Sequence, residues 1–177
     1  MSEESSSKPK SRKPHGGPGG ARADREKIVT VLHIDDDPND TELLRAATRR
    51  ANSRFDLQNV EDGEHAVAYL KGTGHYSDRR QYPLPDLILL DLKMPRATGL
   101  EMLKWIREHP EFGNVPVVVL SGSELHEDIR QAYATGANSY LIKPLGFEAL
   151  VELVKDVDAV WLANSSAKNT AAHVSVS

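Results

Sequence analysis

Residues 31–37 read Val31-Leu32-His33-Ile34-Asp35-Asp36-Asp37, an apolar run that ends in three acids. A second apolar run, Leu87-Ile88-Leu89-Leu90, ends in Asp91. Both runs have the length and composition of buried strands, and the carboxyl ends of strands in an open parallel sheet border its binding crevice. Carboxylates crowded into one crevice repel each other unless a cation lies among them. The two runs therefore predict a parallel sheet with a cation-binding acidic cluster at one edge.

Short apolar runs alternate with helical patterns along the rest of the chain. Strands are expected over residues 29–35, 55–60, 87–91, 115–120 and 140–142. The first helix should follow Asp37, which is expected to cap it, with Pro38 at the first helical position. The last helix carries an apolar side made of Leu150, Leu153, Val154, Val157 and Trp161. This alternation predicts an α/β fold, a doubly wound five-stranded parallel sheet with helices on both faces.

Two further features of the sequence are an insertion before the third strand and the helix before the fifth strand. Residues 72–85 form a polar insertion before the third strand, and it is long for a loop in a compact domain. The helix before the fifth strand should end at Gly136 and present an apolar face made of Leu125, Ile129, Ala132 and Tyr133. The insertion has no role that the sequence assigns.

Composition divides the 177 residues into one domain and two tails. Residues 1–26 are rich in Ser, Lys, Pro and Gly and are expected to be a disordered, basic tail. Residues 27–162 should form the domain, and residues 163–177 a flexible tail. Residues 1–27 hold seven Lys or Arg and four Asp or Glu, a net charge of +3. Because the whole chain carries −4, the remaining residues carry −7.

These properties exclude several classes of protein. An acidic domain is poorly suited to grip a nucleic acid backbone, so no DNA partner is expected. The chain has no cysteine, which excludes thiolate catalysis and Cys-ligated metal sites and fits a reducing compartment. No apolar stretch is long enough to cross a bilayer, so a cytoplasmic protein without membrane contact is expected.

Polar side chains follow four of the five expected strands. Asp35 and Asp36 follow the first, Asp91 the third, Ser121 the fourth and Lys143 the fifth. Since parallel strands direct their carboxyl ends to the same edge, all of these side chains should reach one crevice.

This constellation resembles the receiver domain of two-component response regulators, the CheY-like fold, over residues 28–162. The motifs that carry the resemblance are Ile34-Asp35-Asp36-Asp37-Pro38, Asp91-Leu92-Lys93-Met94-Pro95 with Gly99, Leu120-Ser121-Gly122, and Tyr140-Leu141-Ile142-Lys143-Pro144. The resemblance implies the flavodoxin-like strand order 2-1-3-4-5. It also implies a response regulator without an output domain of its own, because about fifteen residues follow the expected domain.

The resemblance assigns a role to each residue of the site. Asp91 would accept a phosphoryl group from a histidine kinase. Mg²⁺ would be held by Asp36, Asp91 and the backbone carbonyl of Lys93, with Asp35 acting mostly through water. Lys143 would pair with Asp91 and then with the phosphate. Ser121 and Tyr140 would form the switch: Ser121 would bind a phosphoryl oxygen, and Tyr140 would then turn inward.

The resemblance also implies partners and one backbone feature. Insertions like residues 72–85 occur in similar response regulators that work with bacterial phytochrome-type kinases. Output would be contact with a downstream protein or transfer of the phosphoryl group to a histidine phosphotransferase, and the apolar side of the last helix is compatible with a homodimer. The bond between Lys143 and Pro144 is expected to be cis, as in the family.

Two other functions fit part of the pattern. Phosphatases of the haloacid-dehalogenase type also use an Asp nucleophile and Mg²⁺, and Asp35 and Asp37 have the spacing of their signature. Asn39 stands where that signature needs Thr or Val. A degenerate receiver that acts as a passive binding module is the other alternative, although every expected side chain is present. His33, on a strand expected to be buried, is interpreted as a core histidine.

Overall fold

The computed structural model describes the chain over residues 28–94 and 98–171, with side chains of the last helix described to residue 161. The strands are β1 (Val29–Ile34), β2 (Phe55–Val60), β3 (Leu87–Leu90), β4 (Val117–Ser121) and β5 (Ser139–Ile142). The helices are α1 (Pro38–Arg50), α2 (Gly63–Lys71), α3 (Gly99–Glu108), α4 (His126–Thr135) and α5 (Phe147–Ala171), with a 3₁₀ turn, η1, at Gly74–Tyr76. The expected tail over residues 1–26 lies outside the described residues.

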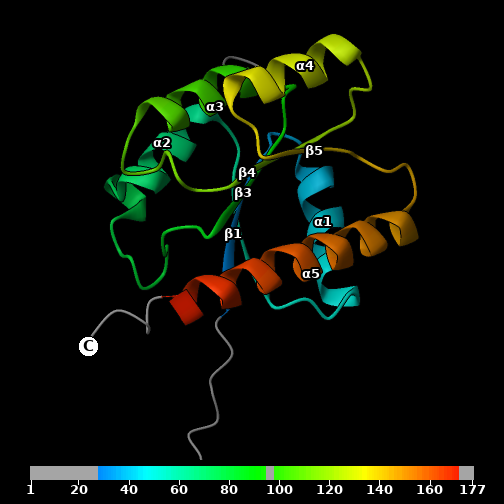
Figure 1. Ribbon diagram of the computed structural model, residues 1–177, viewed down its shortest axis with the longest axis horizontal. Helices are drawn as coiled ribbons and strands as arrows, with labels where there is room; N and C mark the ends of the chain where they lie inside the picture. The colour runs from blue at the N-terminus through cyan, green and yellow to red at the C-terminus, as the bar shows by residue number, and fades with distance from the viewer. Residues whose placement is uncertain (1–27, 95–97, 172–177) are drawn as a thin grey trace, which may run out of the picture.

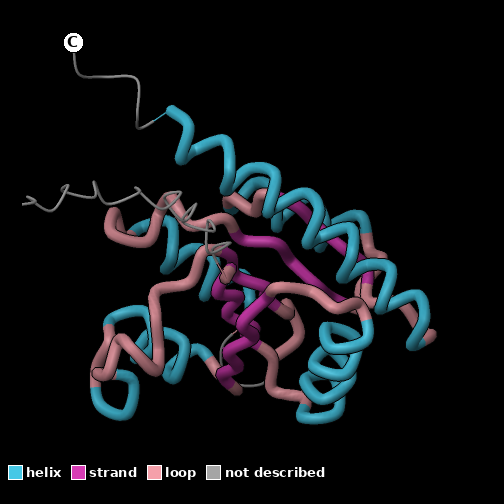
Figure 2. The backbone as a smooth tube through the Cα atoms, turned by 90° about the horizontal axis from the view of Figure 1, so that it is seen from below, coloured by secondary structure: helices cyan, strands magenta, loops and turns pink. Residues whose placement is uncertain are grey.

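All five strands are parallel and lie in the order β2-β1-β3-β4-β5, which confirms the predicted fold. Helices α1 and α5 cover one face of the sheet, and α2, α3 and α4 cover the other (Figure 1). Figure 2, seen from below, shows the strands enclosed between these two helical layers. Because the order reverses between β1 and β3, the ends of these two strands border the crevice of the sheet.

The alternation of side chains along β1 explains why it is buried on both faces. Val29 and Val31 point to the α1 and α5 side, whereas Leu32 and Ile34 point to the α2 and α3 side. All of these side chains are at most 1% exposed. A strand buried on both faces leaves no solvated position for a carboxylate, so the acids follow its last residue, although Thr30 and His33 are buried within it.

Helix α1 begins as predicted. The Asp37 side chain accepts a hydrogen bond from the backbone N–H of Asn39 at 2.8 Å, and Pro38 occupies the first helical position. A proline is tolerated there because its missing N–H would have no partner within the helix. This start directs the first turn of α1 back toward the carboxyl ends of β1 and β3.

The fourth strand begins two residues later than predicted and includes Ser121. Pro116 has no backbone N–H, and Val115 donates its N–H to Phe112 in a turn, so pairing starts at Val117. Ser121 pairs with Ile142 of β5. The hydroxyl expected after the strand is therefore carried by its last residue.

The apolar face predicted for α4 is only partly covered. Ala132 is buried, while Leu125 is 63% and Tyr133 50% exposed. Gly136 caps the helix as predicted, with a φ of +110°. The surface of α4 therefore keeps large apolar groups in contact with solvent.

The insertion, residues 72–85, folds back over the carboxyl end of α2. Tyr76 and Tyr82 pack against the core on the α2 side, and their rings lie 5.1 Å apart. Arg79 donates hydrogen bonds to the carbonyl oxygens of Tyr69 at 2.8 Å and Leu70 at 2.6 Å. The segment thus gives the Leu70 carbonyl a partner at the end of α2, and it gives the Tyr69 carbonyl a second one besides the Gly72 N–H.

Helix α5 extends to Ala171, past residue 163 where a tail was expected to begin. The flexibility of residues 163–177 stays a prediction. No helix within the described ranges is long and apolar enough to cross a bilayer.

Candidate functional site

Three carboxylates meet at the crevice of the sheet. Asp35 and Asp36 follow β1, and Asp91 follows the neighbouring strand β3. One oxygen from each carboxylate lies within 4.8 Å of the other two. Asp35 is 1% and Asp91 7% exposed, while Asp36 is half-buried and opens toward solvent. The predicted acidic cluster is thus assembled from the ends of two adjacent strands.

The donor atoms of this cluster fit a hard divalent cation. Asp91 Oδ1 is buried and accepts no hydrogen bond from any described residue. A buried charged oxygen without a partner is costly, and a cation ligated by carboxylate oxygens removes that cost. Asp35, Asp36 and Asp91 are therefore the residues that could hold such an ion.

The two acids after β1 have opposite electrostatic environments. Burial alone would raise the pKa of Asp35, but contacts from His33 and Lys143 and the backbone N–H of Asp37 lower it to about 2. The pKa of Asp36 is raised, first by desolvation and then by the charges of Asp35 and Asp91. The neighbours of Asp35 thus favour its ionised form, whereas the surroundings of Asp36 disfavour its negative charge.

Lys143 is the cation that the chain itself supplies. Its Nζ lies 2.7 Å from Asp35 Oδ2, 2.7 Å from Asp40 Oδ2 and 3.5 Å from Asp91 Oδ2. Burial would lower the pKa of Lys143, but the hydrogen bonds to Asp35 and Asp40 outweigh it and the pKa is raised. The ammonium group therefore stays charged beside the cluster, and its two shortest contacts are with acids other than Asp91.

Ser121 and Tyr140 lie close to each other and are connected through Ser123. The Ser121 hydroxyl is buried and accepts a hydrogen bond from the Ser123 N–H at 3.4 Å. The Tyr140 hydroxyl donates to the carbonyl oxygen of Ser123 at 2.9 Å, and the ring packs against the small core beneath α4. Burial raises the pKa of Tyr140. The structure gives neither side chain a hydrogen bond to Asp91, so their switch roles stay predictions.

Two expectations at the edge of the site have different outcomes. The Lys143–Pro144 bond is trans, because the described residues contain no cis peptide bond, so the expected cis bond is wrong. Trans is favoured by about 0.5–1 kcal/mol, and the following Leu145 is fully exposed, so no packing there holds the rarer isomer. The role of the Lys93 carbonyl as a ligand stays a prediction.

Sequence reasoning missed the contacts that two residues make at the site. Asp40, in the first turn of α1, lies 2.7 Å from the Lys143 ammonium, and no local pattern in the sequence indicates this pairing. His33 is buried as predicted, with its Nδ1 3.4 Å from the Asn59 amide nitrogen. Its Nε2 lies 3.4 Å from Asp35 Oδ2 and has no hydrogen-bond partner among the described residues, so it is more than a core residue.

Comparison with known proteins gives a consistent family. The model of the response regulator receiver domain matches residues 31–155. A probable methanogenesis regulatory protein, FilR2 of Methanothrix harundinacea, is 34% identical over 84% of this chain and 93% of its own length. The response regulator Rcp1 of Synechocystis is 32% identical over 75% of this chain and 88% of its own length.

Solved structures agree with the sequence comparison. Response regulator RPA3017, from red light signalling in R. palustris, matches with a TM-score of 0.70 and 35% identity over 73% of this chain and 91% of its own. The phosphorylated cyanobacterial phytochrome response regulator RcpA matches with a TM-score of 0.70 and 33% identity over 78% and 96%. The Mn²⁺-bound form of Rcp1 matches with a TM-score of 0.66 and 31% identity over 76% and 94%.

Proposed function

Because the chain belongs to the response regulator receiver domain family of two-component signalling proteins, we propose that Asp91 is its phosphoacceptor. The observation that carries this proposal is the environment of the Asp91 carboxylate. Oδ2 faces the Lys143 ammonium at 3.5 Å, while Oδ1 is buried without a hydrogen-bond partner in the described chain. The two oxygens differ, so one can ligate a cation while the other attacks phosphorus.

Receiver domains take their phosphoryl group from histidine kinases. In the proposed transfer, an Asp91 oxygen forms a bond to phosphorus as the phosphorus–nitrogen bond of a phosphohistidine breaks, and the electron pair remains on the imidazole. The product is an acyl phosphate. Lys143 neutralises charge that gathers on the phosphoryl oxygens, which is most of what phosphoryl transfer requires of a protein. Later hydrolysis of the acyl phosphate resets the domain.

Receiver domains bind a divalent cation, and one structural neighbour was solved with Mn²⁺. We infer that this chain uses Mg²⁺, held by Asp36, Asp91 and the carbonyl of Lys93, with Asp35 acting through water. When bound, the ion supplies positive charge to the carboxylates and to the transferring phosphoryl oxygens.

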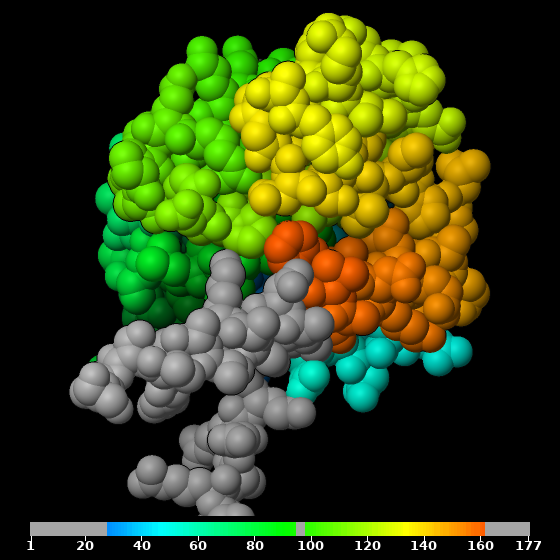
Figure 3. Space-filling view, in the orientation of Figure 1, coloured from blue at the N-terminus to red at the C-terminus, as the bar shows by residue number. Residues whose placement is uncertain are grey.

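We further propose that Ser121 and Tyr140 transmit the modification to the surface. Ser121 ends β4 and Tyr140 lies on β5, and both contact the Ser123 segment that leads into α4. If the Ser121 hydroxyl moves to a phosphoryl oxygen, Tyr140 can shift inward with it. The surface formed by α4, β5 and α5 (Figure 3) would then bind a downstream protein or a histidine phosphotransferase.

The kinase partner is inferred from the relatives. RPA3017 acts in red light signalling, and RcpA is a phytochrome response regulator. We therefore propose a phytochrome-type histidine kinase as the partner of this chain. Purified kinases of this and other types, phosphorylated and mixed with the chain, would rank their transfer rates to Asp91. A cytoplasmic location is part of the same proposal. The family is one of signalling proteins, and the chemistry proposed is limited to its own phosphorylation and dephosphorylation.

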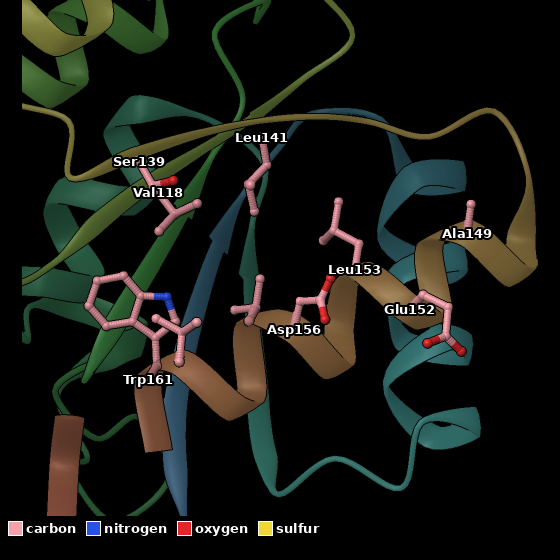
Figure 4. Close-up of a pocket in the computed structure, with 10 residues that line it drawn as sticks. Val118, Ser139, Leu141, Ala149, Glu152, Leu153, Asp156 and Trp161 are labelled. Atoms are coloured by element: carbon pink, nitrogen blue, oxygen red, sulfur yellow. The ribbon is translucent and has the colours of Figure 1, made fainter. Parts of the chain in front are cut away.

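A homodimer is a further part of the proposal. A groove of about 510 Å³ lies between β5 and α5, lined mostly by apolar side chains that include Leu141, Leu153 and Trp161 (Figure 4). Val160 at its edge is 55% exposed. A second copy could cover this apolar surface. Light scattering with and without a phosphoryl mimic measures the molar mass in solution. A mass of two chains would support the homodimer, and a mass of one chain would contradict it.

The phosphoacceptor is tested by intact-mass spectrometry. Wild-type chain incubated with acetyl phosphate and Mg²⁺ should gain one phosphoryl group, and Asp91→Asn should gain none, because an amide cannot form the acyl phosphate. Glu111→Gln, at an exposed acid between α3 and β4, is the control and should be labelled like wild type. Equal labelling of Asp91→Asn and wild type would exclude Asp91 as the acceptor. Sustained turnover of p-nitrophenyl phosphate would instead favour the phosphatase alternative.

A further inference from the structure

Lys143 is bound by an acid that does not belong to the cation cluster. Asp40 Oδ2 lies 2.7 Å from the ammonium nitrogen, as close as Asp35 Oδ2 and closer than Asp91 Oδ2 at 3.5 Å. Asp40 is absent from the group of acids whose oxygens lie together at the crevice. Its contact with Lys143 therefore has a different purpose from cation binding.

The position of Asp40 is fixed by the start of α1. Asp37 caps the helix, Pro38 is its first residue, and Asp40 follows in the first turn. The amino end of a helix favours a negative charge, so an acid is well placed in this turn. The Asp40 side chain is 37% exposed and that of Lys143 19%, so the ion pair is partly screened by water and can open.

We propose that Asp40 is a positioning residue that competes with the phosphoryl group for Lys143. This inference rests on the proposed function, in which Lys143 must reach a phosphoryl oxygen on Asp91. In the unmodified chain, Asp40 and Asp35 draw the ammonium away from Asp91. After phosphorylation the lysine contacts the new oxygens only to the extent that it leaves Asp40. The Asp40 pair thus favours the unphosphorylated state and shortens the life of the phosphorylated one.

Two plainer roles make different predictions. If Asp40 only stabilises the start of α1, its loss should lower the free energy of unfolding without changing ligand affinity. If it only adds negative charge near the site, its loss should weaken Mg²⁺ binding, and any effect on an anionic mimic should not require Lys143. Competition requires Lys143 and acts on the phosphoryl mimic.

The test measures the affinity for beryllofluoride, an anionic phosphoryl mimic, at saturating Mg²⁺. Asp40→Asn should bind the mimic roughly two- to fivefold more tightly than wild type, the change expected from removing a partly exposed ion pair. It should also lose its phosphoryl group more slowly. Asp37→Asn is the matched control, because it removes one negative charge from the same helix start while Asn still caps the helix. It should stay within twofold of wild type.

A double-mutant cycle separates competition from the plainer roles. In a Lys143→Gln background, Asp40→Asn should leave the affinity for the mimic unchanged, since nothing remains to compete for. The side-chain NMR signal of the Lys143 amine gives a second readout: Asp40→Asn should shift it in the free protein but not with the mimic bound. Unchanged or weaker mimic binding in Asp40→Asn, or a gain that persists without Lys143, overturns the inference. If wild type itself gains no phosphoryl group on Asp91, the proposed function fails instead.

Discussion

Asp35 is held ionised by its neighbours, and that makes it sensitive to acid. Its pKa of about 2 in the folded chain lies below the ordinary value of 3.8. A group with a depressed folded pKa stabilises the fold above its unfolded pKa, and this contribution is lost as the pH falls through the folded pKa. The contribution is on the order of 2 kcal/mol at neutral pH. It should disappear as the pH falls from about 4 to 2.

Urea unfolding of cation-free protein at a series of pH values measures this contribution. Between about pH 4 and 2, Asp35→Asn should lose less stability than wild type, because it has no carboxylate to protonate. Asp36 acts with the opposite sign, since its pKa is raised and its protonation favours the folded chain. If the unfolding free energies of wild type and Asp35→Asn ran in parallel through this pH range, the pKa of Asp35 would not be lowered in the folded chain.

Gly99 is needed where α3 starts against the loop after β3. A Cβ added there would overlap the carbonyl oxygen of Asp91 and lie 2.7 Å from the Leu92 Cα. Because both obstacles are backbone, the loop that carries Asp91 would have to move. Gly99→Ala should cost about 1–3 kcal/mol of stability and weaken Mg²⁺ binding. In Gly113→Ala the new Cβ would meet no atom closer than 3.5 Å. Denaturation and Mg²⁺ titration of both variants test this, and equal behaviour would contradict it.

At this scale the sequence predicted which residues meet better than how they pair. Asp35, Asp36, Asp91 and Lys143 were found because strand order alone brings strand ends to one edge. The partner of Lys143 depends on side-chain geometry across more than a hundred residues, and the contact with Asp40 has no local signature in the sequence.

Among the elements, the insertion at residues 72–85 depends on one arginine. Arg79 donates hydrogen bonds to the carbonyl oxygens of Tyr69, Leu70 and Tyr82. Arg79→Ala removes all three bonds, leaves the Tyr69 carbonyl only its bond from the Gly72 N–H, and should cost about 1–3 kcal/mol. Arg80→Ala removes an exposed neighbour and should change stability by less than about 0.5 kcal/mol. Chemical denaturation of the two variants measures both values. A similar cost for both would mean that the guanidinium contacts add nothing.

The sequence predicted the type and order of the five strands and five helices but not the 3₁₀ turn η1, and it was less accurate about where the elements begin and end. Hydrophobic periodicity identifies a buried strand, but Pro116 moves the start of β4, and that effect depends on which N–H groups the sheet needs. Arg107 joins α3 to the segments around β4 by hydrogen bonds to Gly136 and Val115. Long side chains of this kind donate hydrogen bonds to the backbone of distant segments, and hydrophobic periodicity does not predict such bonds.

In the whole molecule, the same sheet supplies stability and stores repulsion. Its three central strands, β1, β3 and β4, are buried along their whole length, so the core tolerates a cluster of like charges at the carboxyl ends of β1 and β3. Acids at such an edge weaken the fold until a cation binds, a compromise common at functional sites. The stability of the domain should therefore depend on the divalent cation and on the number of acids in the cluster.

Asp36 is the acid whose removal should reveal this dependence. Its pKa is raised by desolvation and by the charges of Asp35 and Asp91, so in the ionised state it opposes folding. Without divalent cation, Asp36→Asn should be more stable than wild type by about 0.5 kcal/mol, because solvent at the half-buried carboxylate screens much of the repulsion. Mg²⁺ at ten times its dissociation constant should stabilise wild type by roughly 1.4 kcal/mol.

The same Mg²⁺ concentration should stabilise Asp36→Asn much less, because the variant lacks one of the cation's ligands. Thermal and urea unfolding in chelator and in Mg²⁺ measure all four states, and Glu111→Gln controls for the loss of one negative charge elsewhere. The signs of the two effects carry the argument. A cluster built only for structure would make the variant less stable in chelator. A cluster built to hold a cation makes it more stable there and less responsive to Mg²⁺, since repulsion among the acids and affinity for the ion have the same origin.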